Sequence, residues 1–71
     1  MNAQSPSIGR IVHYVDEHGR HNAAIITEVV SPEYVHLQSF DNKASGSWLH
    51  KNVLFDDTGI KSYSWHWPER G

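Results

Sequence analysis

The chain has 71 residues, a length that allows one domain, because independently folding units usually run from about 50 to 200 residues. Six Lys and Arg against eight Asp and Glu give a formal net charge of −2, the wrong sign for a surface that binds a long nucleic acid backbone. The absence of cysteine excludes disulfides and thiolate metal clusters. A core this small stabilises a fold only weakly, so we expect a homo-oligomer.

The hydrophobic pattern is typical of short strands broken by turn residues, and no window favours a long helix. Residues 1–7 form a polar lead-in, and residues 8–69 form the single domain. The expected strands are residues 8–15, 22–30, 34–40, 48–55 and 63–67, with turns or loops at 16–20, 31–33, 41–47 and 56–59. Five strands without a crossover helix predict an all-β fold, a small five-stranded antiparallel SH3-like barrel or strongly bent sheet. An open sheet would leave exposed edges, so we expect closure or pairing with a second copy.

Nothing in the chain predicts a membrane partner or secretion. The first residues lack the basic and apolar stretches of a signal peptide. The longest apolar run, residues 23–26, is far shorter than the roughly 20 residues that span a bilayer. We therefore expect a soluble protein in the cytoplasm of the cell that makes it.

The segment Trp65-His66-Trp67 offers two interpretations. On a strand, its two indoles share one face and His66 points to the other. In the first interpretation the indoles and Tyr63 fill the core and His66 is solvated, which is how aromatic residues are most often used. In the second, an indole borders a pocket and stacks on a base or a partner side chain. Trp48, at the start of the fourth strand, adds some support to the second.

Three polar residues of the first strand are further candidates for a binding site: Arg10, His13 and Tyr14. Arg10 and Tyr14 share one parity of the strand, and His13 lies on the other. His13 is readily explained as a barrel-wall histidine bonded to a backbone carbonyl. If two copies pair along this strand, however, all three fall near an interface that could hold an anionic ligand.

Catalytic and metal-binding signals are weak. His18 and His21 form an H-x-x-H in a turn beside two acidic residues, but a metal site needs three or four ligands on rigid elements. The chain has no nucleophile elbow and no phosphate-binding glycine loop. Its adjacent carboxylates lie in turns, where they project apart. We therefore expect no metal, no cofactor and no enzymatic activity.

Four segments carry a resemblance to a known family: residues 9–14 (GRIVHY), 24–26 (AII), 35–41 (VHLQSFD) and 64–69 (SWHWPE). They resemble the motifs of a family of small, largely uncharacterised bacteriophage and prophage proteins, which read GRIVHY, AAIVTEV, VNLxVF and GTWHWPE. The resemblance spans roughly residues 8–69. The chain departs from the closing motif at Tyr63, where glycine is more usual, and at Ser64, where threonine is more usual.

The resemblance implies a phage-encoded accessory protein acting in the host cytoplasm. Proteins of this kind include virion components, inhibitors of host factors, and non-enzymatic binders that sequester nucleotide signals of host immunity. We favour an anti-defence binder that holds a small anionic nucleotide at subunit junctions. The candidate ligand-binding residues are Arg10, His13, Tyr14, Trp48, Trp65, His66 and Trp67. A virion structural or decoration component, or an inhibitor docking on a host protein, stays open as the alternative.

Overall fold

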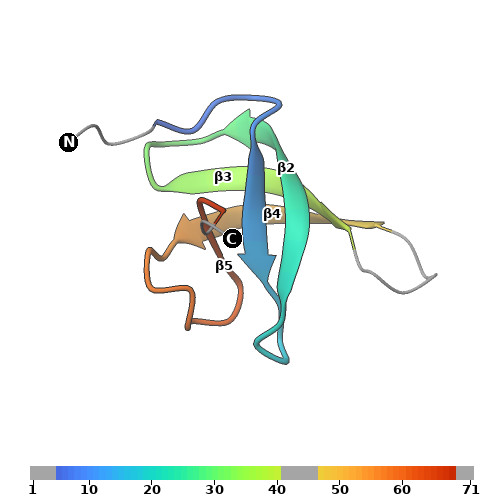
Figure 1. Cartoon of the computed structure of the whole chain (residues 1–71). Coiled ribbons are helices and arrows are strands. Elements are labelled where there is room, and N and C mark those ends of the chain that lie inside the picture. The colour runs from blue at the N-terminus through green and yellow to red at the C-terminus, as the bar shows by residue number, and fades with distance from the viewer. Residues whose placement is uncertain (1–4, 41–46, 69–71) are drawn as a thin grey trace.

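The chain folds into a closed barrel of five strands in sequence order (Figure 1). The computed structural model describes residues 5–40 and 47–68. The strands are β1 (Ile11–Val15), β2 (His21–Val29), β3 (Tyr34–Phe40), β4 (Ser47–Phe55) and β5 (Ser64–His66). The described residues contain no helix. The predicted small five-stranded all-β barrel is confirmed, and most of the predicted loop at 41–47 lies outside the described residues.

The strand ends differ from the prediction where turns intervene. The first strand begins at Ile11 rather than at residue 8, because residues 8–9 form a turn in which Gly9 has a φ of 90°. The last strand is only three residues long, because Tyr63 takes a φ of 62° and the preceding residues turn. Periodicity could not indicate either turn, since both fall beside apolar residues that suit a strand equally well.

The barrel closes through β5, which pairs with β1 on one side and β4 on the other. The β1 pairing is antiparallel and places His13 opposite His66 and Tyr14 opposite Trp65. The β4 pairing is parallel, which departs from the expected antiparallel arrangement. The turns at residues 56–63 carry the chain back so that β5 runs in the direction of β4 (Figure 1). Because the barrel is closed, the outer edges of β1 and β4 are both paired with β5. The expected closure of the sheet is therefore found.

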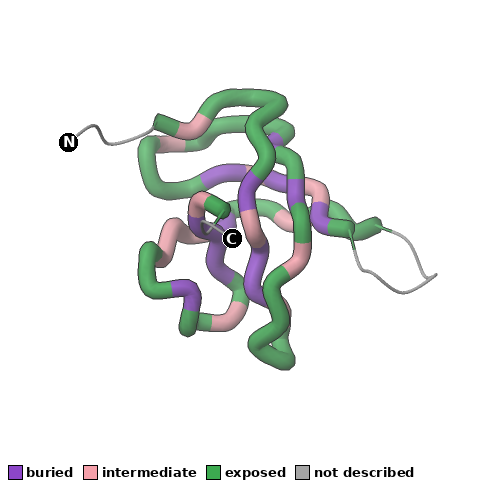
Figure 2. The backbone as a smooth tube through the Cα atoms, in the orientation of Figure 1, coloured by how far each residue is buried: buried purple, intermediate pink, exposed green. Residues whose placement is uncertain are grey.

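The core is one cluster of buried residues to which all five strands contribute; Figure 2 shows the buried stretches of the chain in purple. Its members are Val12, Tyr14, Ala24, Ile26, Val35, Leu37, Val53 and Trp65. Trp65 is the largest, and its indole N–H donates to the carbonyl of Glu33 at 3.1 Å. The same carbonyl accepts the backbone N–H of Phe55 at 2.8 Å. The turn between β2 and β3 is thus joined to both β4 and β5.

Strand β4 carries a bulge opposite β3. Val35 pairs with Val53 and Leu37 with His50, so two residues of β4 face one residue of β3. Asn52 in this bulge has a φ of 55°, and its backbone N–H donates to Nδ1 of His36 at 3.0 Å. The His36 side chain of β3 therefore accepts the backbone N–H of Asn52, which the bulge takes out of the regular sheet hydrogen bonding.

Candidate functional site

A hollow of about 330 Å³ opens at the mouth of the barrel, where β1 ends and β2 begins. We call it the mouth hollow. It is lined by side chains of the β1–β2 hairpin, of β3 and β4, and of the turn before β5: Tyr14, Asp16, Glu17, His18, Arg20, Asn22, Ser39, Trp48, His50 and Tyr63. Its volume lies at the lower end of the range for small-molecule sites, about 300–1,000 Å³. It therefore has room for a ligand the size of one nucleotide.

The inner wall of the hollow is a stacked pair of rings. The rings of Tyr14 and His50 lie 4.2 Å apart and within 21° of parallel. Nε2 of His50 and the hydroxyl of Ser39 are hydrogen-bonded at 2.9 Å. Ser39 lies directly opposite Trp48 on the neighbouring strand, so the wall continues to that indole.

Burial keeps both inner rings neutral near pH 7. It lowers the pKa of His50 below its ordinary value, because an imidazolium would lose hydration there. It also raises the pKa of Tyr14, an effect to which Tyr63 and the carboxylates of Asp16 and Glu17 add. The phenol of Tyr14 is consequently a neutral hydroxyl that can donate to a ligand.

The β1–β2 turn is organised by one carboxylate. Oδ1 of Asp16 accepts the backbone N–H groups of His18 and Arg20, each at 2.9 Å, and Oδ2 accepts the amide of Asn22 at 3.2 Å. Partial burial opposes ionisation of Asp16, but the backbone N–H of Arg20, the Asn22 amide and the His18 N–H outweigh it and lower its pKa. Asp16 thus shapes the rim through the hairpin.

The outer rim carries exposed aromatic and charged side chains. Trp48 is 56% exposed and Tyr63 is 60% exposed. The Tyr63 hydroxyl donates to Glu17 across the hollow at 3.4 Å, and the half-exposed Arg20 lies 3.6 Å from Asp16. An exposed indole beside neutral hydrogen-bonding groups and a guanidinium can stack a planar ring and contact an anion.

The predicted site residues fall in four places rather than one. Tyr14 and Trp48 line the mouth hollow. The Arg10 guanidinium lies 4.8 Å from the ring centre of Trp67, a cation–π contact away from the hollow lining. Trp65 is 1% exposed and belongs to the core. The remaining two, His13 and His66, belong to the outer wall of the barrel, where they lie near His21.

The structure decides between the two interpretations of the closing strand only in part. Trp65 fills the core, and Trp67 packs against it at the edge with a ring separation of 5.3 Å. The first interpretation is wrong about two residues: Tyr63, which it placed in the core, is 60% exposed, and His66, which it left solvated, is 3% exposed. The positive φ of Tyr63 turns its side chain outward, and the turn containing Gly59 covers His66.

Sequence reasoning missed most of the hollow. His50 and Ser39 were not singled out, although both lie on the inward parity of strands that were predicted correctly. Arg20 was assigned only to the 16–20 turn, and His18 was considered only as one half of the H-x-x-H metal pair. The signal that could have found them is a polar side chain at an inward-facing strand position, because a buried polar residue is unusual in a small apolar core.

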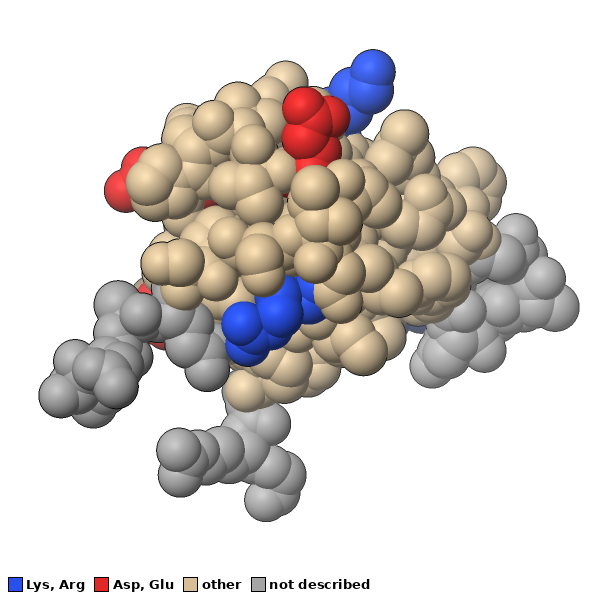
Figure 3. Space-filling view, turned by 90° about the horizontal axis from the view of Figure 1, so that it is seen from above, with Lys and Arg blue, Asp and Glu red and all other residues tan. Residues whose placement is uncertain are grey.

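The surface carries dispersed charge. On the face seen in Figure 3, the coloured side chains of the described residues are few and separated, and they form no continuous basic patch. Among the residues described, no helix is long and apolar enough to cross a membrane. In comparisons with known proteins, no family model, no curated protein and no solved structure matches this chain.

Proposed function

We propose that the protein is a non-enzymatic binder that holds one nucleotide in the mouth hollow. The observation that carries the proposal is an exposed indole, Trp48, on the rim of a hollow of about 330 Å³ whose inner wall is polar. The base stacks on Trp48, and the hydroxyl of Tyr14 donates to a polar edge of the ligand. This site lies within one chain, unlike the subunit junction expected from the sequence.

Among the described charged residues that line the hollow, Arg20 is the one that can contact an anionic group of a ligand. Arg20 is the lining residue with a permanent positive charge, and its side chain is about half exposed. Asp16 is occupied by the hairpin, whereas the exposed carboxylate of Glu17 can accept a ribose hydroxyl. The phosphate is therefore placed at Arg20, and the sugar is placed beside Glu17.

The biological setting of the proposal comes from the resemblance to phage proteins. A binder that holds a nucleotide without converting it lowers the concentration of that nucleotide in solution. In an infected cell this sequesters a nucleotide signal of host defence, and the protein then acts in the host cytoplasm as an anti-defence factor. Nucleotide binding can be correct even if this biological setting is wrong.

Isothermal titration calorimetry with the four ribonucleoside 5′-monophosphates tests the proposal, with adenosine and inorganic phosphate as partial ligands. We expect at least one nucleotide to bind one per chain. The Trp48→Ala variant should weaken its binding about 5- to 150-fold, because base stacking on an aromatic side chain contributes about 1–3 kcal/mol. Leu49→Ala is the matched control, since Leu49 is also 56% exposed on β4 but does not line the hollow.

Three results would contradict the proposal. The first is that none of the nucleotides binds. The second is equal binding by the Trp48→Ala and Leu49→Ala variants, which would place the ligand away from the indole. The third is conversion of the nucleotide during the titration, which would mean an enzyme. If adenosine bound as tightly as its monophosphate, the proposed phosphate contact with Arg20 would be wrong, whereas the proposed stacking on Trp48 would stand.

A second candidate function is docking on a protein, favoured by an apolar strip on the outside of the barrel. We call it the outer band: Ile11, Ile25, Phe40 and Leu49, which are 59%, 36%, 42% and 56% exposed. Ile11 lies opposite Ile25, and Gln38 links Ile25 to Leu49 across β3. Neighbouring exposed apolar groups of this kind mark protein contact sites. A second copy, a virion component or a host protein would use this surface.

A further inference from the structure

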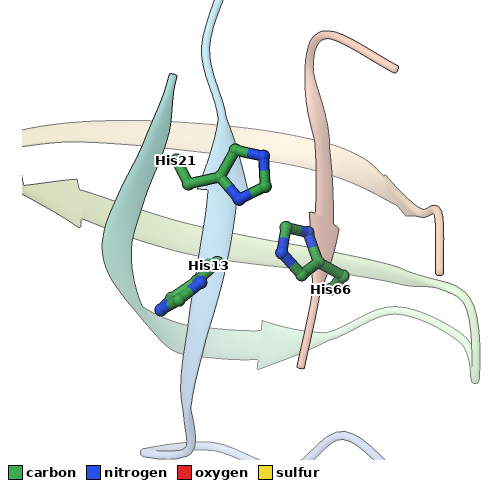
Figure 4. Close-up of side chains that lie close together, drawn as sticks. All are labelled: His13, His21 and His66. Atoms are coloured by element: carbon green, nitrogen blue, oxygen red, sulfur yellow. The ribbon is translucent and has the colours of Figure 1, made fainter. Parts of the chain in front are cut away.

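Three histidines from three strands converge on the outer wall of the barrel (Figure 4). His13 of β1 lies directly opposite His66 of β5, and their ring centres are 5.5 Å apart. The ring of His21, at the start of β2, lies 4.8 Å from that of His66 and 6.2 Å from that of His13. One nitrogen from each ring lies within 4.8 Å of the other two.

The turn over the cluster fixes the tautomer of one ring. Nε2 of His21 is 3.0 Å from the carbonyl oxygen of Gly59. A carbonyl only accepts, so Nε2 carries the proton, and the neutral ring then has its lone pair on Nδ1. A histidine that donates one ring N–H to a carbonyl while the other nitrogen holds a metal is the usual arrangement at protein metal sites.

Gly59 also leaves room for the rings. It is buried and has a φ of 70°, and an added Cβ would lie 3.2 Å from Cε1 of both His21 and His66. The backbone of the turn therefore lies directly against two of the three imidazoles. This contact holds the buried ring of His66 and, together with the Gly59 carbonyl, the ring of His21.

We propose that His13, His21 and His66 bind one divalent transition metal ion, with zinc as the reference ion. Imidazole nitrogen suits zinc, copper and nickel, and three histidines with a fourth position for water or an anion form a known zinc geometry. Zinc–nitrogen bonds of about 2.0–2.1 Å require tetrahedral ligands about 3.3 Å apart. The ligand nitrogens must therefore move closer by roughly 1.5 Å at most to share one ion.

The site differs from the expectation of no metal and from the H-x-x-H considered in the sequence. His18 of that pair lines the mouth hollow, whereas His21 lies with one histidine of β1 and one of β5. None of the three ligands lines the hollow, so the metal proposal is independent of nucleotide binding. Because β1, β2 and β5 each contribute one ligand, the complete site exists only in the closed barrel, and metal binding stabilises that closed state.

Zinc titration of the protein after removal of metals with EDTA and dialysis tests the proposal. Calorimetry should give one Zn²⁺ per chain, and zinc at about 100 times its Kd should raise the Tm by about 10 °C or more. His13→Gln and His21→Gln should each weaken zinc binding at least tenfold, since losses around a metal site commonly cost about 10- to 100-fold. These two variants keep the buried His66 in place. Cobalt(II) provides a second readout, because a tetrahedral cobalt site absorbs visible light strongly.

His18→Gln is the matched control. His18 is an exposed histidine three positions from His21 and outside the cluster. We expect this variant to bind zinc as the unaltered protein does. The proposal is overturned if the unaltered protein binds no zinc, if the His13 and His21 variants bind it undiminished, or if His18→Gln weakens binding as much as His21→Gln. The last result would place the metal on the turn instead.

Discussion

His50 is a half-buried histidine of the mouth hollow whose pKa differs from its ordinary value. Its ring is stacked on Tyr14 and bonded to Ser39, and burial lowers its pKa. In the unfolded chain a histidine takes up its proton near pH 6.5. Between that pH and the lower pKa of the folded state, the unfolded chain binds more protons, so stability falls as the pH falls.

The free energy of unfolding should therefore decrease on going from pH 7 to pH 5.5, by less than the limit of about 1.4 kcal/mol per pH unit set by one proton. Urea unfolding at the two pH values measures it. The His50→Gln variant should lose part of this slope, and the exposed His18→Gln should keep it. An unchanged slope in His50→Gln would disprove the assignment. Protonation of Asp16 also lowers the free energy of unfolding, but only near and below about pH 4, which is outside this pH range.

Parity along a strand predicts which way a side chain points, but not what covers it. The alternation in the last strand correctly separated Trp65 from His66, and alternation in the first strand correctly grouped His13 with Val15. It could not indicate that residues 56–63 lie over the outside of the barrel. That cover buries His66, which the first interpretation left in water.

At the scale of the elements, the bulge in β4 depends on one residue with a positive φ. Asn52 adopts a φ of 55°, a region that asparagine tolerates and β-branched residues avoid. We expect Asn52→Val to destabilise the fold by about 1–2 kcal/mol, and Asn52→Gly to change stability little. Urea unfolding of both variants measures the difference.

A neighbouring position controls for the valine side chain itself. Lys51 is exposed in the same strand and does not have a positive φ, so Lys51→Val should be nearly neutral. Equal losses in Lys51→Val and Asn52→Val would show that the backbone conformation of Asn52 is not the cause.

The strands themselves were largely predictable because hydrophobic alternation and turn residues are local signals. All five were placed, with β3 correct to the residue. The parallel pairing of β4 with β5 was not predicted, since it depends on how residues 56–63 carry the chain from the end of β4 to the start of β5. The same limit applies to the sites: the hollow and the histidine cluster are each assembled from strands that only closure brings together.

At the scale of the whole molecule, the barrel presents three different surfaces. The mouth hollow lies at one end, the histidine cluster lies under the 56–63 turns, and the outer band crosses β1 to β4. The proposed ligand, metal ion and protein partner would therefore not compete for the same side chains.

We expect the outer band to join two copies of the chain. Leu49 is 56% exposed on this band, and a charge there would have to be buried against a second copy. The Leu49→Glu variant should therefore sediment as a monomer, and the unaltered protein as an oligomer at micromolar concentration. Lys51→Glu, a second exposed change on β4 outside the band, should keep the oligomer. A monomeric unaltered protein would contradict this expectation.

The pairing of the first strand with the last also governs how the molecule folds. Tyr14 meets Trp65 only when nearly the whole described chain has been brought together. Such non-local contacts cost chain entropy before they contribute stability, so barrels of this kind fold in milliseconds to seconds rather than microseconds. Until β5 docks, β1 and β4 are open edges and the largest core side chain is absent. The interval before closure is therefore when this chain is most exposed to aggregation.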